Sequence, residues 1–106
     1  MKLAVLLSTD EPETNWNALR LANFARKQGD DVSVFLVGKG VDYERGSCAK
    51  FDAKGQAEDL LRAGGRLLAC GTCLKSRERG GTELCPVSTM KDLYELVRDS
   101  DRVVSF

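Results

Sequence analysis

The chain has 106 residues, the length of one domain with a single hydrophobic core. Its 16 basic and 16 acidic residues cancel, so no overall field attracts nucleic acid or an anionic membrane surface. Histidine is absent, which excludes imidazole as a general base, as a metal ligand and as the partner of a nucleophilic serine or cysteine. We therefore expect a single domain over residues 1–106 that binds no nucleic acid.

The chain also lacks the patterns of a membrane or secreted protein. The N-terminal apolar run ends at Ser8-Thr9-Asp10-Glu11, too early for the hydrophobic region of a signal peptide. No stretch approaches the roughly 18 apolar residues of a spanning helix. We expect a cytoplasmic protein without a membrane span. In that reducing compartment the four cysteines indicate reactive or metal-bound thiols rather than a disulfide framework.

In chain order, Leu3 to Leu7 is a continuous apolar run, typical of a strand that is buried on both faces. Asp10-Glu11-Pro12-Glu13 predicts the start of a helix, with an acidic cap candidate at Asp10 and proline in the first turn. That helix runs to Gln28 and ends at Gly29. Its buried stripe is predicted at Ala18, Leu21, Ala22 and Ala25. Val32 to Val37 predicts a second strand, and residues 41–52 form the longest irregular stretch.

The second half continues the alternation. A helical stripe at Ala57, Leu60, Leu61 and Gly64 ends at Gly64-Gly65 and is followed by a strand over Arg66 to Cys70. A short basic helix runs to Arg79, and Thr82 to Val87 predicts a strand that Pro86 places near an edge or a strand end.

Ser88 or Thr89 caps the last helix of the chain, and Arg102 to Phe106 is a fifth strand. The apolar stripe of this helix consists of Met90, Leu93, Tyr94 and Val97. Strands that alternate with helices predict βαβ units. We therefore expect an α/β fold of three layers, α/β/α, with a five-stranded, mainly parallel sheet.

All four cysteines follow predicted strands. Cys48 lies in the loop after the second strand, Cys70 and Cys73 follow the third, and Cys85 lies near the end of the fourth. Sites in such folds form beyond the carboxyl ends of the strands, so the four thiols are predicted to share one rim of the sheet.

Cys70-Gly71-Thr72-Cys73 stands at the predicted junction between a buried strand and a helix. Unpaired N–H groups at a helix start favour negative charge, and the cations of Lys75 and Arg77 are close in sequence. Such surroundings lower the pKa of a thiol and expose the nucleophilic thiolate. Gly71 and Thr72 are predicted to let the backbone approach a ligand sulfur or anion.

The chain resembles the DsrE/DsrF-like family of sulfur-relay proteins, in particular a Cys-Gly-Thr-Cys branch. The likeness rests on Cys70-Gly71-Thr72-Cys73 after the third strand, on the following basic helix, on residues 88–96 and on the ending Asp101 to Phe106. The basic helix, about two residues longer, and the extra thiols Cys48 and Cys85 depart from the branch.

The resemblance implies a five-stranded parallel sheet between helices and a homotrimer or hexamer. It also implies that Cys70 accepts sulfur as a persulfide from a donor and passes it to an acceptor, a sulfurtransferase-type transfer. Cys73 matches the branch's second cysteine. No cofactor or metal is required, since thiol exchange suffices. Donors and acceptors would be other proteins or small sulfur species.

Three alternatives stay open. Cys70 and Cys73 could form a dithiol/disulfide oxidoreductase, although thioredoxin-type motifs follow an early strand and carry a preceding tryptophan. The four thiols could hold a structural zinc ion, although Cys48 and Cys85 are singletons rather than a second close pair. The chain could also be a non-catalytic subunit whose function is the oligomer.

Overall fold

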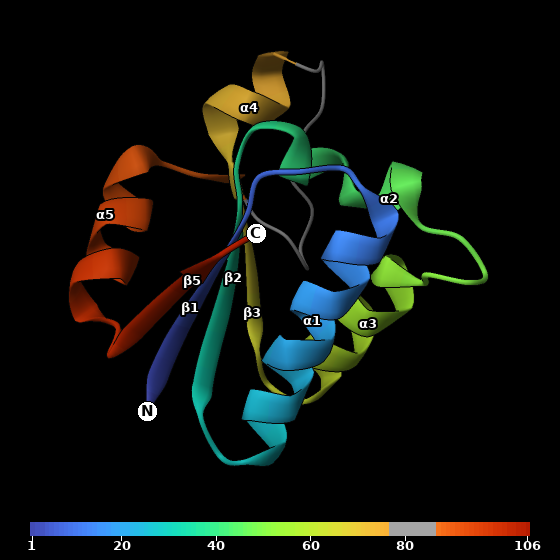
Figure 1. Ribbon diagram of the computed structural model, residues 1–106. Coiled ribbons are helices and arrows are strands. Elements are labelled where there is room, and N and C mark those ends of the chain that lie inside the picture. The colour runs from blue at the N-terminus through green and yellow to red at the C-terminus, as the bar shows by residue number, and fades with distance from the viewer. Residues whose placement is uncertain (77–86) are drawn as a thin grey trace.

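The structure, a computed structural model, describes residues 1–76 and 87–106. These residues form a parallel sheet with helices on both faces (Figure 1). The strands in sheet order are β4 (Val87–Ser88), β3 (Arg66–Cys70), β2 (Asp31–Leu36), β1 (Lys2–Leu7) and β5 (Arg102–Ser105). Every pairing between these five strands is parallel. The predicted α/β class and five-stranded sheet are confirmed, and the sheet is parallel throughout.

The two faces of the sheet are covered unequally. Helices α1 (Pro12–Lys27) and α3 (Ala53–Arg62) pack side by side on one face, and α5 (Met90–Asp99) lies on the other (Figure 1). The main core lies under α1 and α3, where the apolar side chains of the inner strands are almost completely buried. The short helix α4 (Gly71–Ser76) begins directly at the carboxyl end of β3.

The stretch 41–52, predicted as irregular, contains two short helical elements. A 3₁₀ helix, η1 (Gly38–Asp42), leads into α2 (Tyr43–Gly46). Val41 and Tyr43 are 4% and 7% exposed, so apolar burial holds these turns although their sequence carries no helical stripe. A local pattern search misses such elements because the packing that stabilises them is not local.

The first helix differs from its prediction at two positions. Glu11 is the cap instead of Asp10, because its carboxylate accepts hydrogen bonds from the N–H groups of Glu13 and Thr14. Leu19 is buried and Leu21 is 42% exposed, the reverse of the predicted stripe. The helix packs against α3 as well as the sheet, and this rotates the buried face toward Leu19.

The predicted fourth strand, 82–87, lies mostly outside the described residues, which contain only its end in β4. Ser88 belongs to that strand and pairs with Cys70, so Thr89 is the cap of α5. Thr89 and Asp92 form a capping box, in which each side chain accepts the other residue's backbone N–H.

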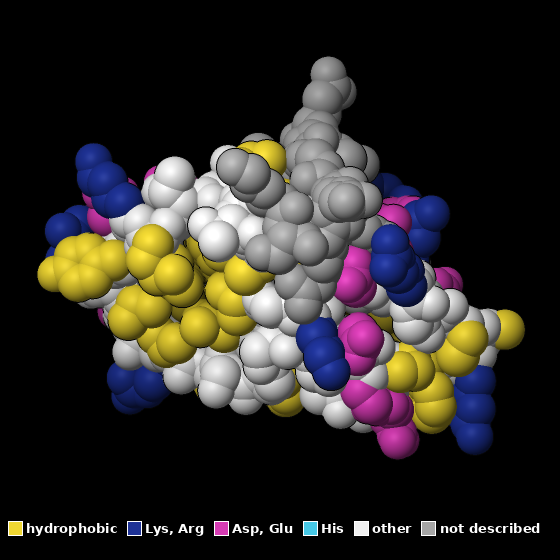
Figure 2. Space-filling view, turned by 90° about the horizontal axis from the view of Figure 1, so that it is seen from above, with side chains coloured by type: hydrophobic (Ala, Val, Ile, Leu, Met, Phe, Trp, Pro, Cys, Tyr) yellow, Lys and Arg dark blue, Asp and Glu magenta, His cyan; other side chains and the backbone are white. Residues whose placement is uncertain are grey.

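The stripe predicted for α5 is largely exposed. Met90, Tyr94 and Val97 are 67%, 63% and 43% exposed, and none of the described residues of α5 is buried. A groove of about 370 Å³ separates the helix from the amino half of the sheet, with Leu96 facing it from the helix. Figure 2 shows hydrophobic side chains gathered on the α5 side of the molecule. This helix therefore covers its face of the sheet only loosely.

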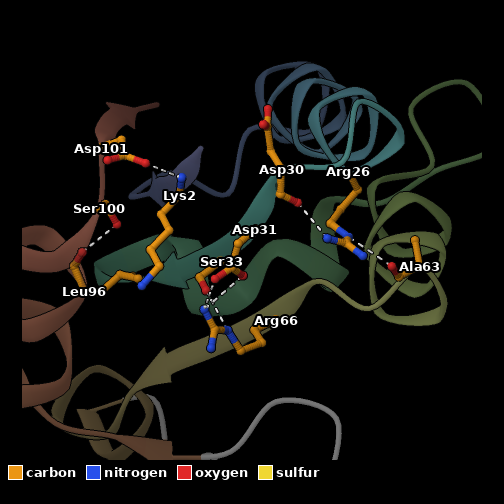
Figure 3. A network of polar contacts seen from close by, with 10 residues as sticks. All are labelled: Lys2, Arg26, Asp30, Asp31, Ser33, Ala63, Arg66, Leu96, Ser100 and Asp101. Atoms are coloured by element: carbon orange, nitrogen blue, oxygen red, sulfur yellow. Dashed lines mark hydrogen bonds and ion pairs between the residues drawn. The ribbon is translucent and has the colours of Figure 1, made fainter.

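Polar contacts tie the strands together at their amino ends (Figure 3). Arg66 Nε donates to Ser33 Oγ at 2.8 Å, and its Nη2 lies 3.2 Å from Asp31 Oδ1, which links β3 to β2. The Lys2 N–H donates to Asp101 Oδ2 at 2.7 Å and links β1 to the turn before β5. These contacts lie at the amino ends of the strands, whereas the cysteine segment lies at their carboxyl ends.

Gly40 brings η1 into direct contact with the end of β1. A Cβ atom at this position would lie 2.0 Å from the carbonyl oxygen of Leu7, a backbone atom that cannot move aside. We expect Gly40→Ala to lower the free energy of unfolding by about 2–3 kcal/mol, the upper part of the range for overpacking, because the clash is with the backbone.

Gly29→Ala is the matched control. Gly29 has φ +93° but open space around it, so only backbone strain of about 1 kcal/mol is expected. Urea unfolding of both variants measures the difference. Equal unfolding midpoints for the two variants would contradict the prediction, because they would show that the backbone around Gly40 moves to accept the added methyl group.

Candidate functional site

The strand-to-helix junction predicted for the cysteine segment is present. β3 ends at Cys70, whose side chain is 5% exposed, and α4 starts with the next residue. The sulfur of Cys70 accepts hydrogen bonds from the backbone N–H groups of Thr72 and Cys73. N–H groups in the first turn of a helix have no partner within the helix, so they are available to a sulfur placed just before it.

The surroundings of Cys70 act on its pKa in opposite directions. Burial raises the pKa of the thiol, because it removes water from the thiolate. The hydrogen bonds from the Cys73 N–H, the Cys73 thiol and the Thr72 N–H lower it, and together they outweigh burial. The pKa of Cys70 therefore lies below its ordinary value, which enlarges the fraction of the thiolate near neutral pH.

Cys73 links this site to the loop after β2. Its sulfur accepts a hydrogen bond from the Gly38 N–H at 3.1 Å, and its thiol also contacts the sulfur of Cys70. Cys73 is partly buried and packs against the main core. Two adjacent strand ends, those of β2 and β3, thus converge on the pair of sulfurs.

Gly38 is the member of this group that sequence reasoning missed. Gly38 directly follows the second predicted strand, and it lies 35 positions from Cys73 in the sequence. A glycine pair directly after an apolar strand was the available signal. It predicts a backbone that can approach other groups closely, but not which group it approaches.

The other predicted site residues have separate positions. Gly71 packs against β4, where an added Cβ would lie 2.8 Å from a methyl group of Val87. Lys75 lies in α4, and its side chain is outside the described part of the structure, as are Arg77 and Cys85. The roles in ligand binding predicted for these residues and for Thr72 remain predictions.

Cys48 does not join the pair. It is exposed, in the loop between α2 and α3. Over residues 1–76 and 87–106, no three cysteine, aspartate or glutamate side chains gather as a possible metal site. Cys48, Cys70 and Cys73 form no disulfide bond with one another. The described part of the chain therefore brings together two of the four thiols and gives the zinc alternative no cluster.

Comparison with known proteins supports the resemblance over the whole chain. Residues 1–106 match the DsrE/DsrF-like family. The chain belongs to this family. Among its relatives are the uncharacterized protein MJ0989 of Methanocaldococcus jannaschii, 33% identical with full coverage of both chains, and the uncharacterized protein MK0008 of Methanopyrus kandleri. The second is 32% identical over 89% of this chain and 83% of its own length.

Two solved structures share the fold of this family member. The YchN protein from E. coli superimposes with a TM-score of 0.81 at 23% identity, covering 100% of both chains. A conserved protein of unknown function from Bacteroides thetaiotaomicron, BT1422, gives a TM-score of 0.79 at 19% identity, over 99% of this chain and 94% of its own. In the part of the chain described, no helix is long and apolar enough to cross a membrane.

The hydrogen bonds at Cys70 predict its reactivity as a function of pH. Because they favour the thiolate, the rate of alkylation by iodoacetamide should rise with a midpoint below the ordinary thiol value of about 8.5. Cys73→Ala removes the thiol contact but keeps the Cys73 N–H, so the midpoint should shift upward. Mass spectrometry of the Cys70 peptide measures both profiles.

Cys48→Ala is the control, because Cys48 lies outside the group and its loss should leave the Cys70 profile unchanged. Midpoints, not absolute rates, are compared, since burial slows the reagent at Cys70. A Cys70 midpoint at or above 8.5 would contradict the assigned hydrogen bonds.

Proposed function

We propose that this protein is a sulfur carrier of an intracellular sulfur relay, in the Cys-Gly-Thr-Cys branch of its family. It would accept sulfur as a persulfide on Cys70 and pass it to an acceptor thiol. The observation that carries the proposal is the sulfur of Cys70, which is nearly buried yet receives two backbone N–H groups and the Cys73 thiol. Membership of a family of sulfur-relay proteins supports the same chemistry.

The transfer balances without a cofactor. The Cys70 thiolate attacks the outer sulfur of a donor persulfide, R–S–SH, and forms the new S–S bond. The donor's S–S bond breaks, and R–S⁻ leaves with the electron pair. An acceptor thiolate then attacks the outer sulfur of the Cys70 persulfide, and Cys70 leaves as the thiolate. Its own hydrogen bonds stabilise that leaving group.

Cys73 provides a second route of release. Its thiolate can attack the inner sulfur of the persulfide, on Cys70, and expel hydrosulfide, which leaves a Cys70–Cys73 disulfide. The contact between the two sulfurs favours this dithiol route as the second candidate function. Gly71, Thr72, Lys75 and Arg77 are proposed to bind the incoming sulfur species beside the pair.

Incubation with a persulfide donor, followed by intact-mass spectrometry, separates the two functions. We expect a gain of one sulfur atom per chain in the wild type and in Cys48→Ser, and no gain in Cys70→Ser. Cys73→Ser should still load, because Cys73 is not the attacking group.

A wild-type product that has lost two hydrogens instead would favour the oxidoreductase. Loading that persists in Cys70→Ser would remove Cys70 from the proposed role. Zinc in stoichiometric amount in protein purified without added metal, lost in Cys48→Ser, would favour the zinc site.

We further propose that the chain acts as a homotrimer or hexamer that buries the outer face of α5. The exposed Met90, Tyr94 and Val97 follow one another along that helix, and Val103 is exposed on the neighbouring edge strand β5. Contiguous apolar surface of this kind is typical of a subunit interface. The small core of a 106-residue domain gives a second reason for assembly.

Tyr94→Glu tests the proposed interface. A charge placed in the interface should convert the oligomer to monomers in light scattering at micromolar concentration. Phe24→Glu is a matched control, because Phe24 is equally exposed at 62% but lies on α1, on the opposite face of the sheet. A wild-type monomer, or dissociation only in Phe24→Glu, would contradict the proposal.

A further inference from the structure

The loop after β2 is held against the end of β1 at both of its ends. At the first end the Val37 N–H donates to the Leu7 carbonyl at 2.9 Å, and within the loop the Gly40 N–H donates to the Val37 carbonyl at 2.9 Å. Gly40 also lies so close to the Leu7 carbonyl that no side chain fits between them. The segment between these anchors therefore has little freedom to follow a group that moves away from it.

Gly38 lies between the two anchors and presents its N–H to Cys73. Its φ of +54° is in the left-handed region that glycine adopts without strain. The resulting hydrogen bond to the Cys73 sulfur is 3.1 Å long and partly buried. The sulfur of Cys73 thus accepts a hydrogen bond from the Gly38 amide while its thiol contacts Cys70.

We propose that the Gly38 N–H holds Cys73 back from Cys70, so that a sulfur carried on Cys70 goes to an external acceptor instead of being expelled by Cys73. The inference rests on the proposed carrier function and adds a positioning residue to it. A covalent S–S bond is much shorter than a hydrogen-bonded contact between two sulfurs. To attack Cys70, the Cys73 sulfur must therefore leave an amide that cannot follow it.

The electronic effect of the amide acts in the same direction. The attack of Cys73 uses a sulfur lone pair and spreads its negative charge over the leaving group. A donor that stabilises the charge on the free Cys73 thiolate is lost in this step, so its presence slows the reaction. An ordinary hydrogen bond corresponds to about a five-fold factor in rate.

The test deletes this single N–H group. An ester in place of the peptide bond between Val37 and Gly38 removes the donor and keeps glycine's backbone freedom. Cys70 is then converted to a mixed disulfide with thionitrobenzoate, in a chain that carries Cys48→Ser and Cys85→Ser. Attack by the Cys73 thiolate forms the Cys70–Cys73 disulfide and releases the coloured thionitrobenzoate anion, so atoms and charge balance.

We expect the ester to accelerate this release about five-fold at a pH above the titration of the thiols, where the thiolate fraction no longer changes. An ester at Lys39, one residue farther along the same loop, should leave the rate unchanged. Release that does not accelerate, or an equal acceleration by the Lys39 ester, would overturn the proposal. So would acceleration that persists when Cys73→Ala is added.

An amide signal provides a second readout that needs no ester. In Cys73→Ala, the Gly38 amide proton should exchange with solvent at least about five-fold faster, because it loses its acceptor. It should be unchanged in Cys48→Ala. Unaltered exchange in Cys73→Ala would overturn the proposal.

The two proposals fail separately. The thionitrobenzoate assay involves no persulfide. If the protein takes up no sulfur but shows these effects, the proposed carrier function is wrong and the proposed restraint of Cys73 by the Gly38 N–H stands. If Cys70 loads sulfur but these effects are missing, the carrier function stands and the restraint of Cys73 by Gly38 is wrong.

Discussion

Parallel pairing of β2 with β3 is the constraint on which the site depends. The register places Leu36 beside Ala69, so strands β2 and β3 end at nearly the same level, at the same end of the sheet. The loop after β2 and the turn into α4 must then share one small space. Gly38 and Cys73 meet there although they are 35 positions apart. If the two strands were antiparallel, one of these segments would lie at the opposite end of the strands.

The same geometry resolves a conflict at Cys70. A sulfur at the end of a buried strand loses water, which disfavours the thiolate. The chain turns into α4 at the next residue, and the N–H groups of Thr72 and Cys73 then face the sulfur that would otherwise be unsolvated. Hydrogen bonds to a charged group are stronger than those to neutral groups, so a few of them can offset partial desolvation. Both effects come from the position of one residue at the junction.

The sheet's second face is finished differently from its first. α1 and α3 close one face with a continuous apolar core, whereas α5 leaves a groove against the sheet and keeps much of its apolar stripe outside. The capping box of Thr89 and Asp92 holds the start of this helix locally, without relying on burial. A helix that is stable by its own caps can present an apolar face to another subunit.

Local patterns in the sequence determined the strand–helix alternation, the fold class and the junction at Cys70. Continuous apolar runs identify strands buried on both faces, and the glycine at position 29 ends a helix whatever surrounds it. These features need only neighbouring residues, which is why they could be predicted. The helical turns at Val41 and Tyr43 could not, because burial against distant residues stabilises them.

Tertiary structure alone decided which way each helix faces and which groups meet at the rim. The choice of Leu19 over Leu21 depends on α3, which packs beside α1, and the exposure of the α5 stripe depends on how that helix crosses the sheet. The cysteine segment was correctly predicted to stand at a junction between the third strand and a helix. The selection of Cys73 and the exclusion of Cys48, together with the Gly38 amide, required the parallel register, because it sets the spatial neighbours of residues that are far apart in the chain.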